Sequence, residues 1–270
     1  MFTDYSGTYA NKVLFLMSFM FFLSVITSPS APLTDPDNQH NMSNLSDNTI
    51  KAQPLANDGT DQICIFCHTP HSATPDSPLW SRPDPATSTF PIYGNPLVIA
   101  GSLGTNPSGQ TSRSQYNTAD VYPNGASRMC LSCHDGVTAI GLLNDSTTIN
   151  MLGPTTLSGY NSAINLEASH PISFVYVSGV VTDLETYYGA DSYTLPSTVD
   201  AIDTPLDGQS RMQCTTCHDP HEDTRAGAPD GLPFWRENTG NDATDYDAVC
   251  GACHSVIPTV LPGEHQIPQL

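Results

Sequence analysis

Cysteine and histidine recur together in this chain at one fixed spacing. All eight cysteines fall in four copies of the pattern C-x-x-C-H. The copies are Cys64-Ile-Phe-Cys67-His68, Cys130-Leu-Ser-Cys133-His134, Cys214-Thr-Thr-Cys217-His218 and Cys250-Gly-Ala-Cys253-His254. Residues three apart on a helical turn face the same way, so both thiols of a copy can bond to one planar group. The histidine that follows projects beneath that group, where its imidazole can ligate a metal ion.

This spacing is the attachment signature of c-type haem. Disulfides, zinc sites and a thioredoxin-like redox motif are the alternatives for paired cysteines. None of these alternatives needs a histidine after every second cysteine, and a thioredoxin-like motif would occur once, near a βαβ pattern. The sequence therefore predicts four covalently bound haem c groups, each with its motif histidine as the first axial ligand of iron.

Five further histidines are available as sixth ligands for the four irons. His71 and His221 each follow a motif histidine by three residues, so neither can reach the opposite face of its own haem. Each must cross to a neighbouring haem, which requires close packing of the haems. The predicted sixth ligands are His40, His71, His170 and His221. An exposed surface histidine is the alternative for His40 and His265, and a methionine ligand would raise the reduction potential.

Composition argues against an ordinary globular core. Only 13% of residues are charged, 38% are hydrophobic, and the chain holds 23 prolines and 19 glycines. The predicted fold is mostly irregular coil, with short helical turns at the C-x-x-C-H sites, a few short strands and a core of stacked haems. The run 172–181 is the main strand candidate. A net charge of −19 excludes binding to the nucleic-acid backbone as the main function.

The first thirty residues differ from the rest of the chain. The run VLFLMSFMFFLSVI at 13–26 has serine as its only polar residue and follows Lys12. Its length is typical of the apolar region of a signal peptide, and a membrane anchor is the alternative. We therefore expect residues 1–30 to be a signal peptide and residues 31–270 to form a single, exported tetrahaem domain.

An internal duplication divides this domain. One paired-haem module covers about residues 62–136, a connector covers 137–211, and a second module covers about 212–258. Both tryptophans of the chain occupy equivalent places between the two motifs of a module. Each is followed by an arginine, in Trp80-Ser-Arg82 and Trp235-Arg236.

The segments CIFCHTPH, PLWSR, CLSCHDG, SHPISF, CHDPH and CGACH occur in that order. Together they resemble the doubled C-x-x-C-H multihaem cytochromes, in particular the OmcE-type tetrahaem extracellular cytochromes, over about residues 38–256. The resemblance implies haems with two histidine ligands stacked in a chain, a loop-rich elongated subunit that polymerises into filaments, and an axial ligand lent between subunits. His40 is the candidate for that shared ligand, because it lies on a polar arm, and His265 is the reserve.

The expected function is electron transfer rather than catalysis. Iron with two histidine ligands has no open position for a substrate. The leading expectation is an extracellular filament that passes electrons to redox proteins or extracellular acceptors. The alternative is a monomeric periplasmic shuttle with the same haems. A multihaem reductase is less favoured, because no C-x-x-C-K variant occurs and the histidines suffice for all four irons.

Overall fold

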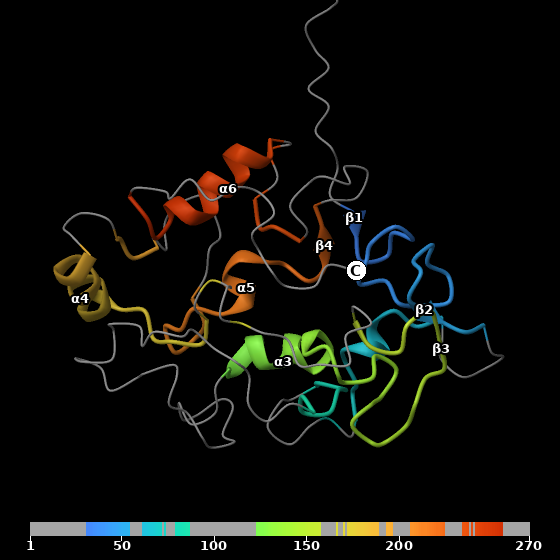
Figure 1. The fold of residues 1–270 in the computed structure, drawn as a ribbon. Coiled ribbons are helices and arrows are strands. Elements are labelled where there is room, and N and C mark those ends of the chain that lie inside the picture. The colour runs from blue at the N-terminus through green and yellow to red at the C-terminus, as the bar shows by residue number, and fades with distance from the viewer. Residues whose placement is uncertain are drawn as a thin grey trace, which may run out of the picture.

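The computed structural model describes part of the chain. The described residues are 31–54, 61–71, 73, 79–86, 123–157, 166, 170, 172–188, 193–196, 206–224, 234–237, 239 and 241–255. The helices are η1 (Cys64–Phe66, a 3-10 turn), α3 (Gly125–His134), α4 (Ser178–Tyr188), α5 (Cys214–Cys217) and α6 (Asp242–Gly251). The strands are β1 (Ala31–Pro32), β2 (Lys51–Ala52), β3 (Met151–Leu152) and β4 (Glu222–Asp223). Figure 1 shows these short elements joined by irregular chain, with α3 and α5 in the middle.

A buried glutamine joins α3 to α5, and so the second motif to the third. The Gln213 side-chain oxygen accepts hydrogen bonds from the Ser127 hydroxyl at 2.6 Å and the Ser127 amide at 3.1 Å. The same hydroxyl accepts the Cys214 amide at 2.9 Å. Gly125 begins α3 with φ +54°, and a Cβ there would lie 2.8 Å from the Gln213 side-chain nitrogen. A glycine is therefore favoured where the two helices approach.

The N-terminal arm packs against the segment that follows the third motif. β1 pairs antiparallel with β4, with Ala31 opposite Asp223. Buried Asn38 donates to the Ala31 carbonyl at 2.9 Å, and its own side-chain oxygen accepts the His40 amide at 2.9 Å. The arm is thus held at Ala31 and again at Asn38. This places His40 beside the segment that follows the third motif.

The apolar core consists of two small clusters rather than one. The first gathers around the first motif and contains Met42, Ile50, Ala52, Phe66, Ile140, Leu143, Ile149 and Leu157. The second lies between the connector and the fourth motif and contains Phe174, Tyr176, Val180, Leu184, Met212 and Cys253. Each cluster adjoins cysteines of the motifs, so apolar packing and the motifs occupy the same regions of the molecule.

Two features of the predicted fold differ from the structure. The expected strand at 172–181 is wrong: Val175 makes an isolated bridge to Arg211, and α4 begins at Ser178. Helices are also not confined to motif turns, because α4 has 11 residues and contains no motif. The buried side chains Val180 and Leu184 lie one helical turn apart and pack into the second cluster, which favours a helix there. In the described part of the chain, no helix has the length and apolar character needed to cross a membrane.

Arg82 holds the second motif to the loop that follows it. Its fully buried guanidinium donates to the carbonyls of Ser132 and Ala139, both at 2.9 Å, of Leu142 at 2.7 Å, and of Ile140. One side chain therefore satisfies four carbonyl oxygens.

Replacing Arg82 with methionine is expected to lower the free energy of unfolding by about 2–4 kcal/mol, because buried carbonyls lose a charged donor. Thermal unfolding followed by circular dichroism measures the change. Lys51→Met is the control, since Lys51 donates to a single carbonyl, that of Ser46, at 2.6 Å. An Arg82→Met midpoint equal to that of Lys51→Met would contradict the assignment.

Candidate functional site

The C-x-x-C-H motifs share one backbone geometry. In η1, the His68 amide donates to the Cys64 carbonyl at 2.7 Å. The His218 amide donates to Cys214 at 3.0 Å, and the His254 amide to Cys250 at 2.9 Å. The remaining motif forms the last turns of α3, which ends at His134. Every motif is thus a helical turn, as predicted, and its histidine lies where that turn ends.

The eight cysteines are all free thiols. Burial raises the pKa of Cys67 and of Cys217 to about 12, and that of Cys253 to about 11. These thiols are therefore neutral at pH 7 in the chain without thioether bonds. Among the described side chains, no group of three or more His, Cys, Asp and Glu is arranged to hold a metal ion by itself.

The second and third motifs touch through their first cysteines. A hydrogen bond with Cys214 and burial raise the pKa of Cys130, and the same hydrogen bond lowers the pKa of Cys214. Haem groups bonded to these two sulfurs would lie close to each other. The contact joins the first module to the second.

Among the described residues, a second histidine ring faces the motif histidines His68, His134 and His254. The ring centres of His68 and His221 are 6.4 Å apart, with planes 18° from parallel. Those of His134 and His40 are 6.0 Å apart at 70°. Those of His254 and His170 are 6.3 Å apart at 85°. In each pair a motif histidine meets one of the predicted sixth ligands.

These separations fit an iron held between two imidazoles. A ligating imidazole nitrogen lies about 2 Å from its metal, and the ring centre about 1 Å further away, so trans ligands on one metal have centres about 6 Å apart. Parallel rings in van der Waals contact would lie closer, at about 4.5 Å, than the 6.4 Å of the near-parallel pair His68–His221. The residues present therefore fit haem iron with two histidine ligands at three motifs.

Two of the distal histidines, His40 and His221, have a polar partner at Nδ1. His40 Nδ1 lies 2.8 Å from the Pro220 carbonyl, and the ring stacks on Phe234 at 4.1 Å. His221 Nδ1 lies 3.2 Å from an Asp219 carboxylate oxygen. With Nδ1 engaged, Nε2 remains available as a ligand, and hydrogen bonds of this kind orient metal-bound histidines in other sites.

Burial keeps the His40–His134 pair uncharged. It lowers the pKa of His40, and together with the neighbouring His40 and His218 it lowers the pKa of His134 to about 3. Only a neutral imidazole offers a lone pair to iron. The pair is therefore in the protonation state that ligation needs at neutral pH.

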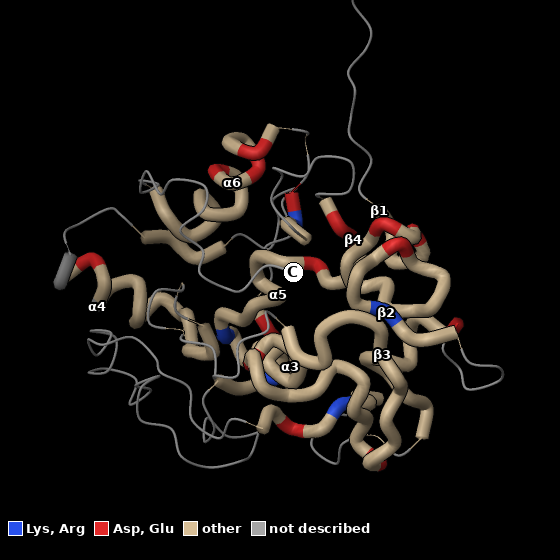
Figure 2. The backbone as a smooth tube through the Cα atoms, turned by 45° about the vertical axis from the view of Figure 1, so that its right-hand side comes forward, with Lys and Arg blue, Asp and Glu red and all other residues tan. Residues whose placement is uncertain are grey.

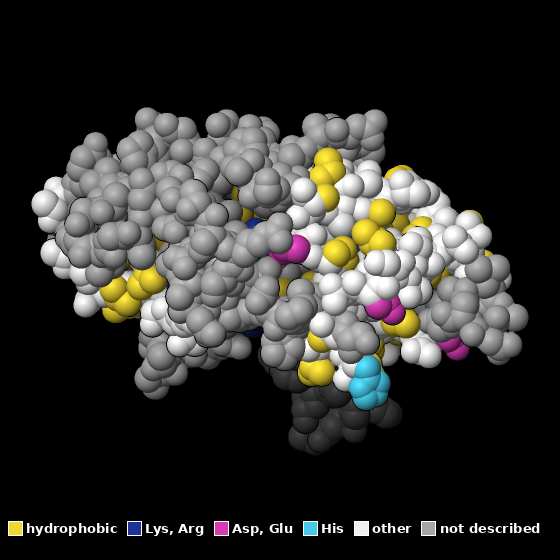
Figure 3. Space-filling model, turned by 90° about the horizontal axis from the view of Figure 1, so that it is seen from below, with side chains coloured by type: hydrophobic (Ala, Val, Ile, Leu, Met, Phe, Trp, Pro, Cys, Tyr) yellow, Lys and Arg dark blue, Asp and Glu magenta, His cyan; other side chains and the backbone are white. Residues whose placement is uncertain are grey.

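The remaining predicted histidines are placed differently. His71 is exposed, with its carbonyl accepting the Thr69 hydroxyl, and His265 lies outside the described residues. A histidine side chain is visible at the surface in Figure 3. His40 is the candidate for a ligand shared with a neighbouring subunit, and within its own chain its ring lies against His134. The arm is folded onto residues 220–223.

The sequence analysis missed one aromatic residue at the site. Tyr193 forms a bridge with His254, and their ring centres are 5.3 Å apart. Backbone bridges of the same kind join His68 to Trp80 and His218 to Trp235. The tryptophans could be found because they recur in the duplication, whereas Tyr193 precedes its motif and belongs to no repeat.

Comparison with known proteins bears on the second module. Residues 205–258 match the doubled CXXCH motif family. The match supports a multihaem c-type cytochrome with covalently bound haem c, and it points to electron transfer rather than catalysis. No curated protein matches the chain. The matched range contains the third and fourth motifs, and the first module repeats their arrangement.

Proposed function

We propose that this chain is a tetrahaem c-type cytochrome that carries electrons along closely packed haems with two histidine ligands each. The observation that carries the proposal is the set of three histidine pairs, in which motif and distal rings are 6.0–6.4 Å apart. Bound haem supplies a one-electron centre, and the chain supplies its attachment, its ligands and its separation from water. Low reduction potentials follow from histidine ligation at both faces.

The fourth pair follows from the duplication. His221 of the second module lies opposite His68 of the first. Reciprocity assigns His71 of the first module to His218 of the second, because both occupy the place three residues after a motif histidine. The exchange of ligands between modules is what the two H-x-P-H segments predict.

Intact mass tests the proposal directly. The mature protein is expected to exceed its polypeptide mass by four haem groups. Replacing both Cys64 and Cys67 with serine should remove one haem and leave the other three attached. Fewer than four haems in fully matured wild-type protein would contradict the proposal.

The angles between the paired rings predict different ferric spectra. Parallel imidazole planes split the iron orbitals of π symmetry and give a rhombic low-spin signal, whereas perpendicular planes give a strongly axial one. The pair His68–His221, at 18°, should give a rhombic signal, and the pairs at 70° and 85° should give axial signals. Electron paramagnetic resonance of the oxidised protein measures both. Four rhombic signals would show that these pairs are not the axial ligands.

For the place of action, we propose export and assembly into an extracellular filament, with a monomeric periplasmic shuttle as the alternative. Acidic residues lie along α6 and around β1 and β4 (Figure 2), so subunits with a net charge of −19 need directional contacts to associate. The pair His40–His134 lets the chain complete that iron site alone, which favours the shuttle. Electron microscopy and sedimentation of native material distinguish the two: filaments support the first, and monomers at physiological salt support the second.

A further inference from the structure

Three motif histidines face an aromatic side chain across the same kind of backbone bridge. His68 pairs with Trp80, His218 with Trp235 and His254 with Tyr193. The ring centres are 5.7, 5.3 and 5.3 Å apart, respectively. His134 is placed otherwise, because it is the last residue of helix α3.

The hydrogen bonds around these bridges repeat from site to site. The amide after the aromatic residue donates to the carbonyl of the second motif cysteine in every case. These donors and acceptors are Ser81 to Cys67 at 3.0 Å, Arg236 to Cys217 at 3.0 Å, and Thr194 to Cys253 at 2.8 Å. In an antiparallel bridge flanked in this way, the two facing side chains lie on the same side and close together. The bridge therefore aims the aromatic ring at the imidazole.

Backbone strain accompanies two of the three bridges. The residues before the tryptophans, Leu79 and Phe234, have φ of +65° and +54°. A bulky residue in the left-handed region costs about 1–2 kcal/mol. The same strained conformation at equivalent places in both modules indicates a requirement for the direction in which the following tryptophan points.

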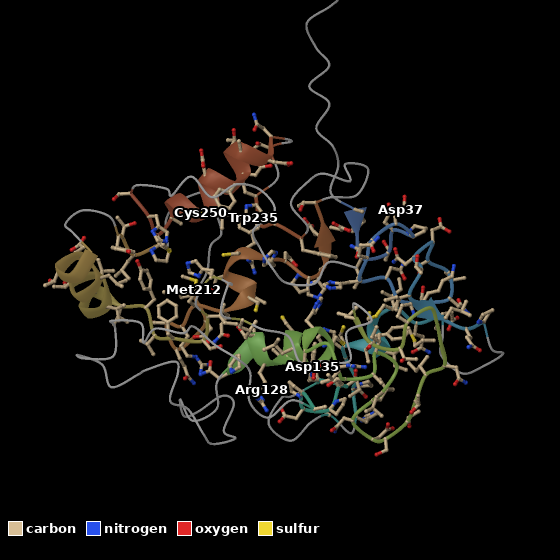
Figure 4. The ribbon with its side chains drawn as sticks, viewed as in Figure 1. Asp37, Arg128, Asp135, Met212, Trp235 and Cys250 are labelled. Carbon is tan, nitrogen blue, oxygen red and sulfur yellow. The ribbon has the colours of Figure 1, made fainter. Side chains whose placement is uncertain are left out.

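Trp235 and the Tyr193 segment are also held by structure outside their motifs. Trp235 lies beneath α6 in Figure 4, where its indole N–H donates to the Asp245 carbonyl at 2.8 Å and its ring stacks on Tyr246. The Tyr193 segment is held by Tyr176, whose hydroxyl donates to the Thr194 carbonyl at 2.8 Å. A ring fixed in this way restricts rotation of the imidazole beside it.

We propose that Trp80, Trp235 and Tyr193 are positioning residues that fix the planes of the axial imidazoles of His68, His218 and His254. The inference deepens the proposed function and rests on it. The aromatic residues act through the histidines. The orientation of the imidazole plane sets the electron paramagnetic resonance signal of the ferric haem and influences the reduction potential of each site. The second-motif site, with no such bridge at His134, is the internal comparison.

The test compares electron paramagnetic resonance spectra of the oxidised wild-type holoprotein and of single-substitution variants. Trp80→Leu is expected to shift or broaden the rhombic signal of the His68 site and to leave the other three signals unchanged. Tyr193→Leu should alter only the axial signal of the His254 site. Trp235→Leu should alter only the signal of the His218 site. Up to about a tenfold change in the ferric to ferrous ratio at fixed potential, or about 59 mV for one electron, is expected at the altered site.

Conservative variants and a matched control separate positioning from general stability. Trp80→Phe, Trp235→Phe and Tyr193→Phe keep a ring and should restore the wild-type signals. Phe174→Leu removes a buried aromatic side chain of the second apolar cluster and should alter none. If a tryptophan-to-leucine variant yields no holoprotein, Tyr193→Leu decides the matter, because Tyr193 is only half-buried.

The outcomes distinguish this inference from the proposed function. Unchanged signals in Trp80→Leu and Tyr193→Leu, with four low-spin haems retained, would overturn the positioning role and leave the cytochrome proposal intact. Fewer than four haems in the wild-type protein would overturn the proposed function itself. A signal change at a site other than the one named would also contradict the assignment.

Discussion

Replacing His221 with alanine is expected to produce a single carbon-monoxide-binding haem in each chain, where the wild-type protein has none. In the structure His221 is the second ring opposite His68, at 6.4 Å. Removing it leaves the iron at His68 with an open position, and ferric iron of that site should become high-spin. Titration of the reduced protein with carbon monoxide, followed by absorbance, counts the open sites.

Two further variants make this result specific. His221→Met retains a ligand, so it should stay low-spin and raise the potential of one haem. His265→Ala removes a histidine that is absent from the three pairs, and no open site is expected. A His221→Ala protein that binds no carbon monoxide would show that another residue ligates this iron.

Replacing His40 with alanine is expected to open the iron at His134 in the same way. The ring lies 6.0 Å from His134, held by the Pro220 carbonyl and by stacking on Phe234. The arm itself should remain in place, because Asn38 and the β1–β4 pairing do not depend on the imidazole. A carbon monoxide titration should again find a single reactive haem per chain.

The same variant asks whether the ligand is shared between subunits. If His40 serves its own chain, the size of the assembly is unchanged and added wild-type protein does not close the open site. Filament loss in His40→Ala, or recovery of six-coordination on mixing with wild-type protein, would instead place His40 in a neighbouring subunit. Sedimentation and carbon monoxide titration of the mixture distinguish these results.

The motifs could be predicted because their chemistry is local. Two thiols and an imidazole must meet one porphyrin, so their spacing is fixed within five residues and visible in the sequence. The candidate distal histidines followed from counting and from the repeated H-x-P-H. The sequence predicted that His71 and His221 must ligate a neighbouring haem, but not which motif histidine each distal histidine faces. The two members of a pair lie far apart in the chain, so no local pattern links them.

The rest depended on packing that the sequence does not display. The valine-rich run at 172–181 favours a strand by its β-branched residues, yet Val180 and Leu184 bury one helical face against Phe174 and Met212. Tertiary contacts therefore override local preference. The repeat also differs from its sequence alignment, because the structural equivalent of Arg236 is Ser81 and not Arg82. Arg236 and Ser81 each donate to the carbonyl of the residue after the first cysteine of a motif, at 2.6 and 2.8 Å, respectively.

His221 of the second module lies opposite His68 of the first, and this bears on the order in which the haem sites mature. Synthesis runs from the N-terminus, so Cys64, Cys67 and His68 exist long before residue 221 does. If His221 is the sixth ligand, a haem attached at the first motif before residue 221 is in place would lack that ligand. A chain that stops within the connector would keep the sixth position of that iron open permanently. On this proposal the two modules would have to mature as one unit, and a gene fragment encoding the first alone would yield a reactive haem protein rather than half of an electron carrier.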